Sequence, residues 1–217
     1  MSLTEVQSQP TASLSGYGPV KRLFDIAAAV SLLIALLPLL LLIAVAVKLE
    51  TRGPALFRQA RCGAGSRPFM ALKFRTMHVD AEARLAGMLA ADADLKAEYQ
   101  RHHKLCRDPR VTLLGRILRR TSLDELPQLW NVLAGDMSLI GPRPYMPHEL
   151  APHPAARSAI ARVKPGITGL WQVSGRHRTT FEDRLGFDIA YVERYSLRQD
   201  IVILLRTVMV VLKADGI

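Results

Sequence analysis

An adjacent pair of carboxylates, Asp124 and Glu125, lies in the stretch RTSLDELPQLWNVL of a strongly basic chain. Successive side chains of a helix point about 100° apart, so the two acids cannot face the same way. The two acids therefore suit different roles: an ionised aspartate can attack phosphorus, while its neighbour transfers a proton or orients the reacting groups. The alternative is structural: both acids lie in a first helical turn, where Ser122 and Glu125 have capping-box spacing. In isolation, the stretch favours the structural alternative.

Several cations lie in segments restricted by a strand pattern, a proline or a glycine. Lys73 and Arg75 alternate in the strand-like KFRTM and would face the same side. Cations in such segments can neutralise and position a pyrophosphate, whereas the alternative for each one is a solvated surface charge. The candidate phosphate-binding residues are Lys73, Arg75, Arg119, Arg143 in GPRP and Arg176 in SGR.

The composition narrows the class of partner. The chain has 29 Lys and Arg against 19 Asp and Glu, which points to nucleic acid, an anionic membrane or phosphorylated substrates. Aromatic residues make up only 6% and do not interleave with the basic ones, which argues against binding of single-stranded nucleic acid. Two cysteines make no disulfide framework and favour a reducing compartment. His102, His103 and Cys106 lack the further ligands that a zinc site needs.

A long apolar segment follows a polar start of the chain. No charged residue occurs from Ile26 to Val47, which as a straight helix would cover roughly 33 Å, enough to cross a bilayer core. Pro38 interrupts this segment and predicts a kink. Lys and Arg flank both ends, so charge alone gives no orientation. Both a spanning helix and a re-entrant helix-break-helix remain open from these residues.

The remaining elements can be placed coarsely. Runs around 55–60 and 68–74 flank a glycine-rich turn and predict a β-hairpin, whereas the Ala-rich stretch 79–104 predicts one helix. The Pro- and Gly-rich stretch 141–176 predicts ordered loops with short strands, the usual place for ligand contacts. Helices are also predicted over 181–195 and in the apolar tail at 201–212, which is too short to span a membrane.

Taken together, these stretches resemble the bacterial sugar transferases. The resemblance covers roughly 20 to 217, and its most specific part is DPRVTLLGRILRRTSLDELPQLWNVLAGDMSLIGPRP. It is carried in chain order by KRLFDIAAAV, GPALFRQARCG, KFRTM, that central block, RVKPGITGLWQVSGR and YVERYSLRQDIVILLRTVMVVL. Within the family, the chain resembles the monotopic phosphoglycosyl transferases, in a form with only a short upstream segment that we expect to be the minimal catalytic one.

The resemblance implies a reaction and its residues. Sugar-1-phosphate passes from a UDP-sugar to polyprenyl (undecaprenyl) phosphate and UMP is released, as the first membrane step of exopolysaccharide, capsule or glycoconjugate assembly. By similarity, Asp124 forms a covalent aspartyl-phosphosugar intermediate, Glu125 is its dyad partner, and Mg²⁺ is expected at Asp124. Lys73, Arg119, Arg143 and Arg176 would contact phosphates. Downstream glycosyltransferases are possible partners, and no nucleic acid is expected.

The resemblance also implies an architecture. The expected fold is α+β, mostly helical and membrane-associated, with a small β-hairpin, interfacial amphipathic helices and a re-entrant N-terminal helix broken at Pro38. The expected organisation is a disordered lead-in at 1–19, the re-entrant membrane helix at 20–50, and a catalytic domain at 51–217 on the cytoplasmic face of the bacterial inner membrane. The family often has Ser before that proline, whereas Leu37 stands here.

Two other classes of function compete with this one. A membrane-anchored nucleic-acid-binding or regulatory protein would suit the basic charge and would bind in a salt-dependent manner without Asp124. A nucleotide-sugar hydrolase would release UMP without lipid phosphate. The sugar itself does not follow from the sequence, because hexoses and their N-acetylated forms differ by single contacts.

Overall fold

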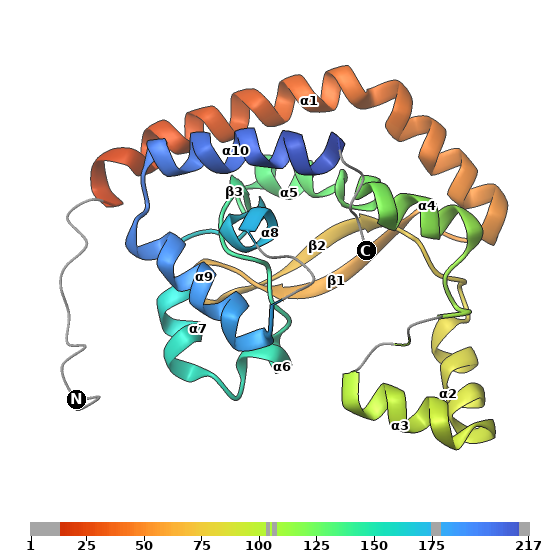
Figure 1. The fold of residues 1–217 in the computed structure, drawn as a ribbon. Helices are drawn as coiled ribbons and strands as arrows, with labels where there is room; N and C mark the ends of the chain where they lie inside the picture. Colours follow the sequence, from red (N-terminus) through yellow and green to blue (C-terminus); the bar gives the residue numbers. More distant parts are fainter. Residues whose placement is uncertain (1–13, 103–104, 106–107, 175–178, 213–217) are drawn as a thin grey trace.

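The computed structural model describes residues 14–102, 105, 108–174 and 179–212. Its first helix, α1 (Leu14–Thr51), contains Pro38 and forms a continuous but bent arch along one side of the molecule (Figure 1). The helix begins before residue 20, so the expected lead-in at 1–19 overlaps it over 14–19. The early start has a tertiary cause, because the Tyr17 hydroxyl donates to Asp200 Oδ2 at 2.6 Å.

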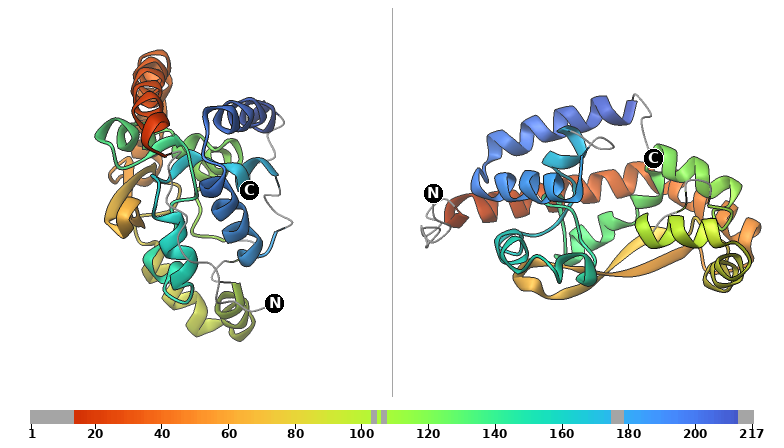
Figure 2. Two further views of the ribbon diagram at one scale, coloured as in Figure 1. Left: turned by 90° about the vertical axis from the view of Figure 1, so that its left-hand side faces the viewer. Right: turned by 60° about the horizontal axis from the view of Figure 1, so that its bottom comes forward.

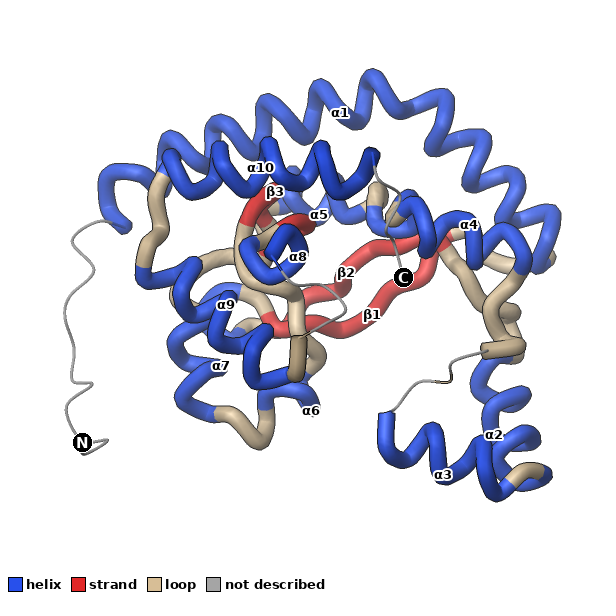
Figure 3. The backbone as a smooth tube through the Cα atoms, in the orientation of Figure 1, coloured by secondary structure: helices blue, strands red, loops and turns tan. Residues whose placement is uncertain are grey.

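A β-hairpin follows α1, as the sequence predicts. Strands β1 (Leu56–Cys62) and β2 (Pro68–Phe74) are antiparallel, and the short 3-10 turn η1 (Ala64–Ser66) joins them. Gly65 in this turn has φ 62, a left-handed conformation that glycine adopts without steric cost. The hairpin forms the larger of the two small sheets in a mostly helical fold (Figure 3).

The single helix predicted over 79–104 is wrong, because two helices occur there. They are α2 (Ala81–Ala91) and α3 (Ala93–His102), which stand apart from the body of the molecule (Figures 1 and 2). Asp92 separates them: its Oδ1 accepts hydrogen bonds from the backbone N–H groups of Asp94 and Leu95. This side-chain cap starts a new helix and outweighs the helical propensity of the surrounding alanines.

The acid pair lies between two helices. Helix α4 (Leu113–Thr121) is followed by the 3-10 turn η2 (Leu123–Glu125) and by α5 (Gln128–Ala134). The capping role predicted for Ser122 is wrong, since its side chain makes no capping hydrogen bond and its φ of 58 is left-handed. Ser122 instead ends α4, with its N–H donating to Arg119 O.

The last third of the chain completes the core. Parallel strands β3 (Ser138–Ile140) and β4 (Gly166–Thr168) precede and follow α6 (Pro147–Leu150) and α7 (Pro154–Ile160) in the chain. The stretch 141–176 thus contains the predicted loops and a short strand, β4, but also short helices that were not predicted. Three further helices follow: α8 (Leu170–Ser174), α9 (Phe181–Glu193) and α10 (Leu197–Leu212). The main core cluster joins both ends of this region to α1 and α5 through residues such as Ala29, Val132, Ile140, Tyr191 and Ile203.

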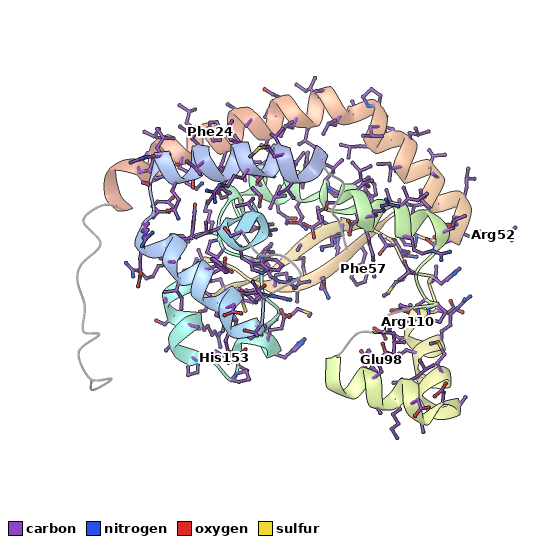
Figure 4. The ribbon with its side chains drawn as sticks, viewed as in Figure 1. Phe24, Arg52, Phe57, Glu98, Arg110 and His153 are labelled. Atoms are coloured by element: carbon purple, nitrogen blue, oxygen red, sulfur yellow. The ribbon has the colours of Figure 1, made fainter. Side chains whose placement is uncertain are left out.

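One side of the molecule carries most of the exposed apolar side chains. Helices α1 and α10 lie along this side, whereas α6 and α7 lie on the opposite side (Figures 1 and 2). Phe24 on α1 and His153 before α7 mark the two sides (Figure 4). Within the described residues, α1 is the helix that is long and apolar enough to cross a membrane, and its most apolar 18 residues have a mean hydropathy of 3.1. Exposed large apolar side chains include Leu23, Phe24, Ile34, Leu41, Leu42 and Leu49 on α1, Leu113 and Ile117 on α4, and Ile201, Leu205 and Met209 on α10.

Candidate active site

The acid pair has two different environments. Asp124 is buried, with 9% of its surface exposed, whereas the Glu125 side chain is 32% exposed. The pKa of Asp124 is raised to about 6: burial is the main cause and the Glu125 charge adds to it, while the Lys73 and Arg119 charges lower the pKa in part. Asp124 is therefore mainly ionised at neutral pH. A buried, ionised carboxylate between cations is suited to attack an electrophilic phosphorus.

Lys73 reaches the pair from the hairpin. Its Nζ donates to Glu125 Oε1 at 2.6 Å, and the ion pair is partly exposed. Asn131 on α5 brings the two elements together: its Oδ1 accepts from Leu72 N and its Nδ2 donates to Met70 O, both at 2.9 Å. The buried amide thus extends the strand edge and holds α5 against β2.

Arg119 reaches the pair from the last turn of α4. Its Nε donates to Thr76 Oγ1 at 2.9 Å, and its other guanidinium nitrogens make no hydrogen bond to a described residue. Burial lowers the pKa of Arg119, and the nearby charge of Asp124 raises it. Lys73 and Arg119 are thus the two predicted phosphate-binding cations that the fold brings to Asp124.

The other predicted cations lie elsewhere. Arg75 follows the end of β2, and its guanidinium fills the space where a side chain at Gly53 would lie, with Nη1 buried and unpaired among the described residues. Arg143 lies in the loop between β3 and α6, where its guanidinium faces the Trp171 ring at 5.4 Å. Arg176 falls outside the described residues.

Two arginines that sequence reasoning missed lie close to Arg143. We call Arg61, Arg143 and Arg184 the arginine cluster. Arg61 on β1 donates from Nη1 to Pro144 O at 2.9 Å, and Arg184 on α9 lies 4.9 Å from the Trp171 ring centroid. Burial and the charge of Arg143 lower the pKa of both the Arg61 and the Arg184 guanidinium groups. No spacing signal could have found them, because the three residues come from distant segments.

Magnesium fits the residues at the pair. Among the described residues, no group of three or more His, Cys, Asp or Glu side chains could hold a metal. Mg²⁺ does not need such a cage, because it is usually bound through one or two carboxylates together with substrate phosphates and waters. Asp124 supplies a carboxylate of this kind, next to cations that can bind phosphate.

Asp188 anchors the loop that carries Arg143. Its Oδ2 accepts from Arg143 N at 3.0 Å and from the Tyr145 hydroxyl at 2.9 Å. Burial raises the pKa of Asp188 to about 7, compared with about 3.9 in an unfolded chain. The folded protein therefore holds a proton that the unfolded chain has released, and the free energy of unfolding falls as pH rises from about 4 to 7.

Asp188→Asn should remove this part of the pH dependence. We expect the melting temperature of the variant to fall less than that of the wild type between about pH 5 and 8. Differential scanning fluorimetry in detergent measures it, with the exposed Glu193→Gln on the same helix as control. Equal pH dependence in the variant and the wild type would show that Asp188 does not titrate in this range.

The chain is similar to known bacterial proteins over most of its length. The family model for bacterial sugar transferases matches residues 16–214. The UDP-galactose-lipid carrier transferase of Erwinia amylovora is 45% identical over 91% of this chain, which spans 41% of that relative. The UDP-glucose:undecaprenyl-phosphate glucose-1-phosphate transferase of Caulobacter vibrioides is 46% identical, with 90% of this chain and 71% of the relative covered. An exopolysaccharide production protein of Sinorhizobium fredii is 40% identical, with 96% and 92% covered.

Proposed function

This chain belongs to the bacterial sugar transferase family, and from that premise we propose that it transfers sugar-1-phosphate from a UDP-sugar to undecaprenyl phosphate and releases UMP. The observation that carries the proposal is the buried Asp124 beside Glu125, flanked by Lys73 and Arg119. The names of the Caulobacter and Erwinia relatives support the same donor and acceptor classes. In this proposal the lipid-linked product feeds exopolysaccharide assembly, where downstream glycosyltransferases would extend it.

The reaction proceeds in two displacements on one phosphorus. An Asp124 carboxylate oxygen attacks the β-phosphorus of the donor, and the bond to the oxygen shared with the α-phosphate breaks, so that UMP leaves with the electron pair. An oxygen of the lipid phosphate then attacks the same phosphorus, and the bond to Asp124 breaks. The carboxylate is regenerated, and the product is a lipid diphosphate sugar.

The neighbouring groups make this attack feasible. An anionic nucleophile and a pyrophosphate repel each other, and Lys73 and Arg119 offset that repulsion. Glu125 positions Lys73 through their ion pair. A magnesium ion held by Asp124 would supply further charge neutralisation for the phosphates. In this account no phosphate contact is assigned to Arg75, whose guanidinium lies beside Gly53.

The packing of α1 supports a re-entrant anchor. Near its start, Arg22 donates to the carbonyls of Val132 and Leu133, and Asp25 accepts from Leu139 N at 3.0 Å. Near its end, Glu50 accepts from Leu114 N at 3.1 Å.

Both ends of α1 therefore contact one folded domain. A helix that crossed a bilayer core of about 30 Å would place its ends on opposite faces. We propose that Pro38 lets α1 enter and leave the same leaflet. The exposed apolar residues of α4 and α10 would then lie in the interface, on the cytoplasmic face of the inner membrane.

Cysteine labelling tests this topology. In a background with both native cysteines replaced by serine, Ser15→Cys and Arg52→Cys should each resist a membrane-impermeant maleimide added to intact cells. Both should react in inverted membrane vesicles. Labelling of only one site from outside would show a spanning helix, and labelling of both from outside would place the domain on the periplasmic face.

The activity is tested by UMP release from purified protein. UDP-glucose, UDP-galactose and their N-acetylated forms should be supplied with and without undecaprenyl phosphate, in the presence of Mg²⁺. We expect multiple-turnover UMP release with at least one of these donors, and only when lipid phosphate is present. Equal turnover without lipid would instead identify a hydrolase. A complete lack of UMP release across the panel would contradict the proposal.

A further inference from the structure

The arginine cluster carries more positive charge than its neighbours neutralise. The Glu149 carboxylate lies 3.7 Å from Arg61 Nη1 and 3.8 Å from Arg143 Nη2, longer than the 2.7–2.9 Å typical of a charge-assisted hydrogen bond. Glu149 also accepts from Met146 N at 2.6 Å, so its charge is shared with the backbone. Arg184 makes no ion pair with a described residue.

Unused donors accompany this excess charge. The Nε atoms of Arg61 and Arg184 are buried and have no hydrogen-bond partner among the described residues. Asp188, the other acid at the cluster, directs Oδ2 to the Arg143 backbone and to Tyr145. The three guanidinium groups are partly buried and repel one another, because few negative charges lie nearby. An incoming anion would relieve this repulsion.

The cluster is accessible to a ligand from water. The side chains of Arg143 and Arg184 are partly exposed, and Arg143 also lines a small open depression together with Tyr145 and Arg157. Arg61 lies close enough to the acid pair that the Glu125 charge raises its pKa. The cluster therefore lies near the acid pair and presents two partly exposed guanidinium groups to solvent.

The position of the arginine cluster in the fold distinguishes a lipid phosphate from a nucleotide phosphate as its ligand. The exposed apolar residues of α1, α4 and α10 mark the side from which a lipid phosphate would come. Arg143 and Arg184 come instead from the loop before α6 and from the first turns of α9, and α6 and α7 lie on the side away from α1 (Figures 1 and 2). That position favours the water-soluble nucleotide over the lipid.

We propose that Arg143 and Arg184 bind the α-phosphate of the donor nucleotide, and hold UMP after it leaves, while Lys73 and Arg119 bind the phosphate that is transferred. Arg61 is a positioning residue, because its guanidinium holds Pro144 and lies beside Arg143. This inference rests on the proposed function. It divides the site into a nucleotide-phosphate part and a transfer part.

Trp171 provides a direct readout of nucleotide binding. The chain has two tryptophans, so Trp130→Phe leaves Trp171 as the single emitter, beneath the guanidinium groups of Arg143 and Arg184. Titration with UMP should change its emission in a saturable manner. Arg184→Gln should raise the dissociation constant for UMP by about tenfold or more, and Arg184→Lys should restore part of the affinity.

The controls separate binding from folding and from activity. Arg194→Gln, an exposed arginine at the end of α9, should leave UMP affinity unchanged, and circular dichroism should show that each variant is folded. Farnesyl phosphate in detergent should neither change Trp171 emission nor compete with UMP. An unchanged dissociation constant in folded Arg184→Gln, or competition by farnesyl phosphate, would overturn the inference. If UMP binds normally but no lipid-dependent turnover occurs, the proposed function is overturned instead.

Discussion

Asp124→Asn should abolish transfer of the sugar phosphate, with a loss on the order of 10³-fold or more in the rate of UMP release. The amide has the shape of the carboxylate but lacks the anionic oxygen that attacks the β-phosphorus. The fold should survive, because Asp124 is buried and its raised pKa shows that the charged form is disfavoured there. Lipid-dependent UMP release measures the effect, and the exposed Asp94→Asn on α3 serves as control.

The pH dependence gives the same claim a second test. With a pKa of about 6, Asp124 loses its charge as the pH falls, so kcat/KM for the donor should drop about tenfold per unit below that value and level off above it. A rate that does not change between about pH 5 and 7 would contradict the assignment of Asp124 as the group that must be ionised. Substantial turnover by Asp124→Asn would contradict its role as nucleophile.

Lys73→Met should produce the second-largest loss, about 10²-fold in kcat/KM for the donor. The substitution removes the cation that pairs with Glu125 and that lowers the pKa of Asp124. The acidic limb of the pH profile should therefore move to higher pH, which a purely structural role of Lys73 would not cause. Initial rates of UMP release across a pH series measure both effects.

Two comparison variants sharpen this second prediction. Lys73→Arg keeps the charge and should retain the position of the acidic limb while losing less activity than Lys73→Met. Lys96→Met removes an exposed lysine of α3 and should behave like the wild type. If Lys73→Met lowers activity but leaves the acidic limb in place, Lys73 does not lower the pKa of Asp124.

The candidate residues at the acid pair could be picked out because each lies in a short pattern that the family resemblance recognises, whereas the acid pair read alone favoured a capping role. The DELPQ stretch, the KFRTM strand and the basic end of α4 each carry their residue in a short recognisable pattern, and the fold brings Asp124, Lys73 and Arg119 together. The arginine cluster could not be predicted in this way. Arg61 and Arg184 become neighbours of Arg143 only through packing between β1, α9 and a loop.

Two local predictions failed for a physical reason. Ser122 and Glu125 have capping-box spacing, yet Ser122 adopts a left-handed conformation to end α4, so its side chain cannot also start the next turn. Asp92 looked like one polar residue in an Ala-rich helix, yet it caps α3 and divides the segment. In both cases a side-chain or backbone hydrogen bond at one residue outweighed the pattern around it.

The composition of the apolar segment does not distinguish a spanning helix from a re-entrant one. Its length fits a spanning helix and its proline fits a re-entrant one. The contacts of Arg22 and Asp25 at one end and Glu50 at the other favour the re-entrant proposal, because they tie both ends to one domain. Such contacts join residues far apart in the chain and have no signature within the segment.

The covalent intermediate tests the central claim most directly. Protein mixed with a UDP-sugar substrate and Mg²⁺, but without lipid, should release about one UMP per active site and gain the mass of one sugar phosphate. Peptide mapping should place the added mass on Asp124, and undecaprenyl phosphate should then remove it. Lipid-dependent turnover with no adduct, or an adduct on another residue, would contradict the account.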